Sequence, residues 1–200
     1  MPRRTLVVSA VLAIVLLVIL GVVVHLLYRP GAGEEVPLPD VAKESKRILT
    51  VSSSAFNNLS SIPKRYTCDD LDVSPPLSIS DIPKDVKSLA IIVYDPDAPR
   101  GIFYHWIVYS IPPSITTVDE GVGAKNRREI SIGIQGLNDF GYIGYGGPCP
   151  PPGSRHRYIF LVLALDIELD IEPGATPTQV LEICRNHVVG YGILVGLYQR

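Results

Sequence analysis

The chain has 200 residues, a formal net charge of −2 and 19% charged residues, which leaves room for one domain and an appendage. This charge balance excludes the strongly basic surface typical of nucleic-acid binders, so we expect no nucleic-acid partner. Eighteen prolines and 17 glycines predict a chain of strands and turns and argue against a helical bundle.

The N-terminal segment predicts a membrane anchor. Residues 5–28 contain no Asp, Glu, Lys or Arg. As a helix rising ~1.5 Å per residue they would extend about 36 Å, enough to cross a hydrocarbon core of ~30 Å. Arg3 and Arg4 precede the run and favour a cytoplasmic N-terminus. The alternative is a cleaved signal peptide, which would leave the rest of the chain secreted.

The rest of the chain divides into a tether and a domain. Residues 29–47 are interrupted by prolines and glycines, which predicts a tether without regular structure. Residues 48–200 predict one domain, which the anchor at residues 1–28 would hold outside the cytoplasm. We therefore expect a single-pass protein of the cell membrane with an extracytoplasmic domain.

The domain contains several segments that are typical of strands. They are rich in β-branched and aromatic residues and bounded by turn signals. In the third of them, strict alternation would place His105 on the face of Ile107, Tyr109 and Ile111, opposite Trp106. The five expected strands are 48–56, 87–94, 104–111, 156–166 and 191–199.

One helix is well signalled near the C-terminus. Thr176 is a candidate N-cap, Pro177 occupies the first helical position, and Gln179 completes a capping box. The apolar spacing continues to Val188, so we expect the helix to end at Gly190. Strands followed by a single helix exclude a doubly wound sheet.

Three polar features interrupt the strands and could carry chemistry. The segment 95–99 is a corner with two aspartates and two prolines; its ordinary interpretation is a turn capped by carboxylates. His105 lies within an apolar strand, where a histidine is commonly a semi-buried structural residue. The segment 144–153 is rich in Gly and Pro, and its backbone N–H groups could hold an oxyanion, unless it is simply a surface crossover.

The three cysteines are Cys68, Cys149 and Cys184. No Cys-x-x-Cys spacing occurs, which argues against a structural zinc site. The residues alone leave two possibilities open: one disulfide with a free thiol, or three reduced thiols.

Several short motifs occur in order and together resemble one known family. They are Tyr66-Thr67-Cys68-Asp69, Ser74-Pro75-Pro76-Leu77, Asp95-Pro96-Asp97-Ala98-Pro99, Tyr104-His105-Trp106, Asn138-Asp139-Phe140-Gly141, Gly147-Pro148-Cys149-Pro150-Pro151 and His156-Arg157-Tyr158. Over residues 48–200 the chain is similar to the phosphatidylethanolamine-binding proteins (PEBP), in their bacterial and archaeal, Raf-kinase-inhibitor-like branch.

The resemblance implies a mainly β fold, in which a large antiparallel sheet packs on a smaller one with one or two short helices. It also implies a shallow pocket that binds a small anionic ligand or a phospholipid head group, without enzymatic activity, cofactor or metal. Carried over by motif, the ligand-binding residues are Asp95, His105, Gly147, Pro148, His156 and Tyr158. If a disulfide forms, we expect Cys68 and Cys149 to form it, because their motifs flank the pocket.

Two other functions compete with ligand binding. Some relatives in the family inhibit serine proteases, and an anchored domain could do so at the cell surface. No reactive loop is identified in this sequence; the segment 119–128 is long and polar enough for one, and its ordinary interpretation is an exposed loop. A hydrolase is disfavoured because the chain has no Gly-x-Ser-x-Gly elbow, although Ser154 lies close to His156 in sequence. A divalent-metal site built from His105 and His156 with Asp95 and Asp97 is also disfavoured.

Overall fold

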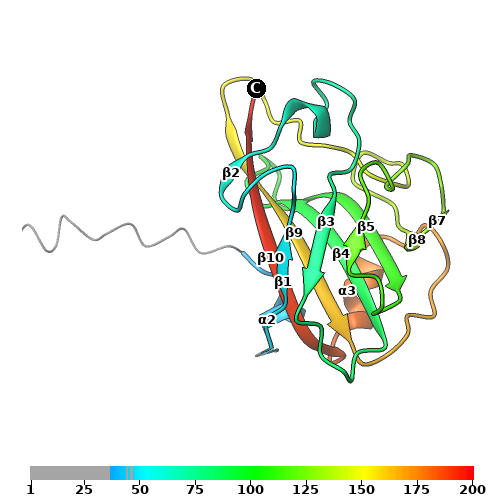
Figure 1. Cartoon of the computed structure of the whole chain (residues 1–200). Helices are drawn as coiled ribbons and strands as arrows, with labels where there is room; N and C mark the ends of the chain where they lie inside the picture. Colours follow the sequence, from blue (N-terminus) through cyan, green and yellow to red (C-terminus); the bar gives the residue numbers. More distant parts are fainter. Residues whose placement is uncertain (1–36, 44, 46) are drawn as a thin grey trace, which may run out of the picture. The chain divides into compact units, whose positions relative to one another are not determined.

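Two β-sheets organise the domain in the computed structural model, which describes residues 37–43, 45 and 47–200 (Figure 1). The larger sheet has seven strands in the order β2-β10-β9-β4-β5-β8-β7, and the smaller has three in the order β1-β3-β6. Every pairing is antiparallel except β10 with β2. The expected two-sheet β architecture is therefore confirmed.

The elements of the described chain are short outside the central strands. The helical elements are α2 (Asp40–Lys43), η1 (Lys64–Tyr66) and α3 (Pro177–Cys184). The strands are β1 (Thr50–Ser52), β2 (Ser60–Ser61), β3 (Leu77–Ser80), β4 (Ser88–Asp95), β5 (Phe103–Ile111), β6 (Thr117–Val118), β7 (Glu129–Ile130), β8 (Gly133–Gln135), β9 (Arg155–Leu165) and β10 (Val188–Gln199).

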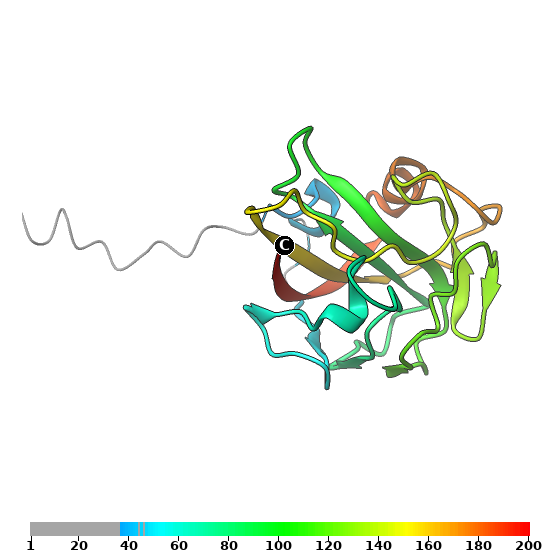
Figure 2. The same cartoon turned by 90° about the horizontal axis from the view of Figure 1, so that it is seen from above.

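The large sheet is covered on both faces. Seen from above, the small sheet lies on one side of it, and α2 and α3 lie on the other (Figure 2). Every residue of β4 is buried, as is nearly all of β9. A strand that is covered on both sides needs apolar residues at every position, which explains the continuous apolar runs of these two segments.

The main hydrophobic core fills the space between the two sheets. Phe160 of β9 is fully buried there and packs on Phe56, with ring centroids 5.6 Å apart. Leu77 and Ile79 of β3 supply the wall from the small sheet, and Trp106 of β5 lies at 0% exposure on the other side. Burial of these apolar side chains stabilises the folded domain and offsets the conformational entropy that its many loops lose on folding.

The membrane-helix prediction falls on residues outside the described part of the chain. Within residues 37–43, 45 and 47–200, no helix is long and apolar enough to cross a membrane. The compact unit of the described chain begins at Leu38. Val41 and Ala42 of α2 are buried, so the last part of the expected tether packs on the domain.

The predicted helix is shorter than its sequence pattern. The capping box at Thr176 is present, and Gln179 N donates to Thr176 Oγ1 at 3.3 Å. The helix ends at Cys184 rather than near Gly190, because Asn186 adopts a left-handed conformation (φ 67°) and Val188 already pairs with β9. Strand pairing has overridden a helical pattern.

The alternation expected for 104–111 was wrong because β5 contains two irregularities. Against β4 it carries an extra residue at His105 and another at the Tyr109–Ser110 step. Ser110 has a positive φ of 55°. Each bulge reverses the alternation, so Ile111 joins Trp106 in the core between the sheets.

Candidate functional site

A pocket of about 250 Å³ lies where β4 ends and β9 begins. Four of its polar side chains are almost completely buried: Asp95 and His105 at 3% exposure, His156 at 6% and Tyr158 at 0%. The pocket is lined by Asp95, Ala98, Pro99, Phe103, His105, Phe140, Cys149, Pro150, Pro151, His156 and Tyr158.

The bulge in β5 brings His105 to this pocket. Tyr104 and Trp106 pair with consecutive residues of β4, so His105 between them has no counterpart there. Because two residues stand opposite one at a bulge, His105 and Trp106 both face the small sheet. The His105 ring meets the Tyr158 ring edge to face, with centroids 5.2 Å apart.

His105 is held by a backbone carbonyl. Its Nδ1 lies 2.7 Å from the oxygen of Gly146. A carbonyl oxygen only accepts hydrogen bonds, so Nδ1 carries the hydrogen. Burial lowers the pKa of His105 below its ordinary value, although the Gly146 carbonyl and the charge of Asp95 oppose that shift. The ring is therefore neutral near pH 7, and its burial costs stability as the pH falls through the ordinary histidine range.

His156 is held by the carboxylate of Asp95. The distance from His156 Nδ1 to Asp95 Oδ2 is 2.7 Å, and both side chains are buried. The other carboxylate oxygen of Asp95 accepts a hydrogen bond from the backbone N–H of Asp97 at 2.8 Å. The aspartate thus orients the imidazole and also caps the turn, as the ordinary interpretation of this corner predicted.

A second aspartate fastens the same corner to β9. Asp97 accepts hydrogen bonds from the backbone N–H and Nε of Arg157, both at 2.9 Å, and from its Nη2 at 2.6 Å. The guanidinium lowers the pKa of Asp97. A bidentate pair of this kind fixes orientation as well as distance. This ion pair holds the corner that carries Asp95 against the start of β9, where His156 lies.

The Tyr158 hydroxyl is the unsatisfied polar group of the site. It is buried, and among the described residues it makes no hydrogen bond of normal geometry. Burial raises the pKa of Tyr158, and the charge of Asp95 and a hydrogen bond of poor geometry to its carboxylate raise it further, so the hydroxyl keeps its hydrogen. Buried polar groups are nearly always paired, so an orphan that lines a pocket marks a place for a ligand or water.

The loop with Gly147 and Pro148 contributes less directly than expected. These two residues are not among those that line the pocket; the wall is formed by Cys149 and the next two prolines. Gly147 N donates to Asp72 Oδ1 at 2.6 Å, and a Cβ on Gly147 would lie 2.3 Å from the oxygen of Tyr66. A glycine is needed here for close backbone approach.

A disulfide closes that loop onto the preceding segment. Cys68 and Cys149 are bonded, with Cα atoms 5.5 Å apart, which is the pairing expected if a disulfide forms. The backbone N–H of Cys68 also donates to the oxygen of Pro148 at 3.2 Å. Cys184 is free and buried.

Two aromatic walls were missed in the sequence. Phe103 and Phe140 pack edge to face at 4.8 Å, and each contacts the His105 ring, at 5.1 and 5.3 Å. Asn138 shapes the loop that carries Phe140: its Oδ1 accepts from the N–H groups of Phe140 and Tyr142. The motif 138–141 was visible, but nothing in it indicated that the phenyl ring would cover a histidine.

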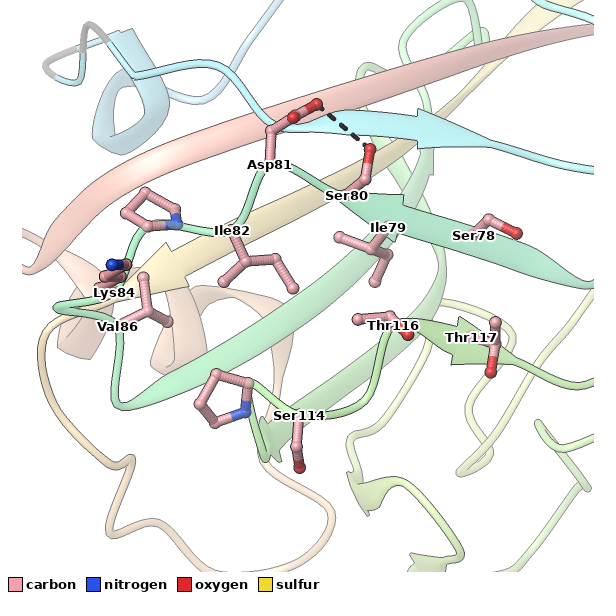
Figure 3. Close-up of a pocket in the computed structure, with 12 residues that line it drawn as sticks. Ser78, Ile79, Ser80, Asp81, Ile82, Lys84, Val86, Ser114, Thr116 and Thr117 are labelled. Carbon is pink, nitrogen blue, oxygen red and sulfur yellow. Dashed lines mark hydrogen bonds between the residues drawn. The ribbon is translucent and has the colours of Figure 1, made fainter.

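A larger cleft of about 780 Å³ lies on the small sheet, between β3, the loop after it and residues 113–117 (Figure 3). Its polar side chains, such as Ser78, Asp81 and Lys84, are exposed. The one hydrogen bond drawn among its lining residues joins Ser80 to Asp81. It is wide and open, with none of the buried convergent groups of the smaller pocket, so we assign the site to the smaller one.

In the described residues, few features support a metal site or a hydrolase. No group of three or more His, Cys, Asp or Glu side chains there is arranged to hold a metal ion. The pocket lining contains no serine, threonine or lysine, and Ser154 is not part of it. Cys149 is bonded to Cys68.

The loop proposed for protease inhibition is tied to the domain. Glu120 pairs with Arg65 at 2.6 Å, and Lys125 pairs with Asp72 at 2.7 Å. The backbone N–H of Gly123 donates to Ser74 Oγ at 3.0 Å. The segment therefore lies against the body of the protein along much of its length.

A two-sheet β domain with a small pocket of buried imidazoles at one end defines a class of small-ligand-binding proteins. The family model described as phosphatidylethanolamine-binding protein matches residues 52–199. The chain belongs to that family, as the sequence motifs predicted.

Two relatives with similar sequences support this assignment. The chain is 47% identical over 152 residues to a UPF0098 protein of Methanothermobacter thermautotrophicus, covering 76% of this chain and 99% of the relative. A UPF0098 protein of Pyrococcus horikoshii is 50% identical over 159 residues, covering 78% of this chain and 79% of the relative.

Two crystal structures share the fold. One is described as a phosphatidylethanolamine-binding protein homologue from Chlamydia trachomatis; it is 41% identical, with a TM-score of 0.70 and coverage of 77% of this chain and 99% of that one. The other is E. coli YbcL, described as a member of the mammalian PEBP family; it is 30% identical, with a TM-score of 0.71 and coverage of 76% and 98%.

Breaking the disulfide should destabilise the domain. The two cysteines are 81 residues apart in sequence, so the bond restricts a long stretch of the unfolded chain. We expect the double variant Cys68→Ser/Cys149→Ser to lose about 2–5 kcal/mol of unfolding free energy, measured by chemical denaturation. Each single variant should lose nearly as much, since either breaks the bond. An unchanged denaturation midpoint in all three would contradict this.

Proposed function

We propose that the domain binds a phosphoryl-bearing anion, without catalysing a reaction, in the pocket of Asp95, His105, His156 and Tyr158. The observation that carries the proposal is the buried Tyr158 hydroxyl, which has no partner of normal geometry in the described chain. It lines the same pocket as two imidazoles whose Nδ1 atoms are already engaged. A phosphoryl ligand would give the hydroxyl a partner and place its other oxygens against the two imidazoles.

The size and lining of the pocket support a small ligand. Its volume of about 250 Å³ is several times that of a water molecule, for which ~30 Å³ is the liquid value. A phosphoryl group and part of its substituent would fit. The aromatic and proline walls would contact the substituent, while the buried polar groups would orient the oxygens. With few polar contacts in an open site, we expect dissociation constants from about micromolar to millimolar.

The lining favours binding over catalysis. No serine, threonine or lysine lines it, and its one cysteine is held in a disulfide. Asp95 already accepts hydrogen bonds from His156 and from the backbone of Asp97, so it is engaged within the protein.

Removing either imidazole should weaken binding of inorganic phosphate. We expect His105→Ala and His156→Ala each to cost about 1–3 kcal/mol of affinity, because each leaves ligand oxygens without a partner. Calorimetric titration of the full chain measures this directly. His187→Ala is a matched control, because His187 also pairs with an aspartate, Asp166, at 2.9 Å, but lies outside the pocket. Wild-type affinity in both pocket variants would refute the assignment.

We also propose that the domain acts outside the cytoplasm, anchored through residues 1–28. The disulfide between Cys68 and Cys149 supports this location, since such bonds usually persist in oxidising compartments. Protease added to intact cells that produce the full chain should then degrade or release the domain. Complete protection until the cells are lysed would contradict an external location.

A further inference from the structure

The hydrogen-bonding capacity of the pocket restricts which phosphoryl compound fits it, an inference that rests on the proposed function. His105 Nδ1 donates to the Gly146 carbonyl at 2.7 Å. In the neutral ring the remaining nitrogen, Nε2, has a lone pair and no hydrogen. No hydrogen bond of Nε2 occurs within the described residues, so His105 offers an acceptor to a ligand.

His156 is arranged in the same way. Its Nδ1 faces Asp95 Oδ2 at 2.7 Å, and a carboxylate accepts hydrogen bonds. In its neutral form, His156 therefore also presents Nε2 as an acceptor. The Tyr158 hydroxyl is the complementary donor, since it keeps its hydrogen and has no acceptor of normal geometry in the described chain.

The charges around these groups are acidic. Asp95 lies against His156. Asp72 acts on His105 and Asp97 acts on Tyr158, but each of these two carboxylates is paired with a cation, Lys125 and Arg157 respectively. No lysine or arginine lines the pocket, so Asp95 supplies the charge that a ligand meets there. A dianion without a P–OH group would bring only acceptors and two negative charges to a site that already holds two acceptors and the charge of Asp95.

We propose that the pocket selects the monoanion of phosphate or of a phosphomonoester, the form that carries at least one P–OH group and a single negative charge. Its P–OH group would donate to an imidazole Nε2, and an unprotonated oxygen would accept from Tyr158. Sulfate has the same shape but carries no proton near neutral pH. A phosphodiester, such as an intact phospholipid head group, has no P–OH group there either. Both would cover the imidazole acceptors without pairing them, which a site built on hydrogen bonds rejects strongly.

The first experiment compares three probes on the full chain by calorimetry at constant ionic strength: inorganic phosphate, sulfate and dimethyl phosphate. We expect phosphate to bind and the other two to bind at least about tenfold more weakly. Equal binding of phosphate and sulfate would overturn the selection while leaving anion binding intact. Binding of none of the three would instead overturn the proposed function.

The second experiment identifies which molecule carries the proton. Phosphomonoesters lose their second proton near pH ~6, below inorganic phosphate. If the ligand carries the proton, the pH at which affinity falls should be lower for methyl phosphate than for inorganic phosphate. If affinity falls at the same pH for both ligands, the titrating proton belongs to a side chain such as His156. That result would overturn the inference. Tyr158→Phe should reduce phosphate affinity at every pH without moving either midpoint.

Discussion

The site depends on one extra residue in β5. Without it, regular alternation would turn His105 and Trp106 to opposite faces of the large sheet. With it, Trp106 fills the core between the sheets while His105 faces Tyr158 across the pocket. The bulge also directs the His105 ring to the Gly146 carbonyl, which sets its tautomer. A local departure from sheet geometry thereby determines which ring nitrogen of His105 is left free in the pocket.

The loops around the bulge are fastened so that this arrangement persists. Asp97 pairs with Arg157 at the corner after β4. The disulfide fixes the proline-rich loop, whose residues form part of the pocket wall. The backbone N–H of Gly153 donates to the oxygen of Arg200 at 2.9 Å, which joins that loop to the end of β10. Figure 1 shows the C-terminus beside this loop. Such fixed loops spare a ligand much of the entropic cost of ordering its site.

Much of the fold could be predicted from the sequence, because long apolar runs and capping signals are local. The central strands and the capping box at Thr176 are examples. The end of α3 could not, because pairing of Val188 with β9 competes with a helical pattern that looks complete in isolation. The short strands at the sheet edges carry too few residues to show a period.

Part of the site could also be predicted, because some of its signals are local in the sequence. Polar residues that interrupt apolar strands indicated Asp95 and His105, and the motifs added His156 and Tyr158. Their convergence depends on a bulge, and a bulge leaves no mark in a sequence that is apolar on both sides of it. Gly147 was predicted to face the ligand, but its hydrogen bonds face Asp72, because glycine in a motif indicates close approach without naming the partner.

Family membership indicates a ligand-binding role, and the proposed selection of a protonated phosphoryl ligand depends on the tautomers of the two histidines. Long-range proton–nitrogen NMR spectra of the ligand-free full chain report these tautomers directly. We expect His105 to be neutral near neutral pH, with its hydrogen on Nδ1, and its pKa to lie below the ordinary value of about 6.5. A hydrogen on Nε2, or an imidazolium at neutral pH, would contradict this expectation.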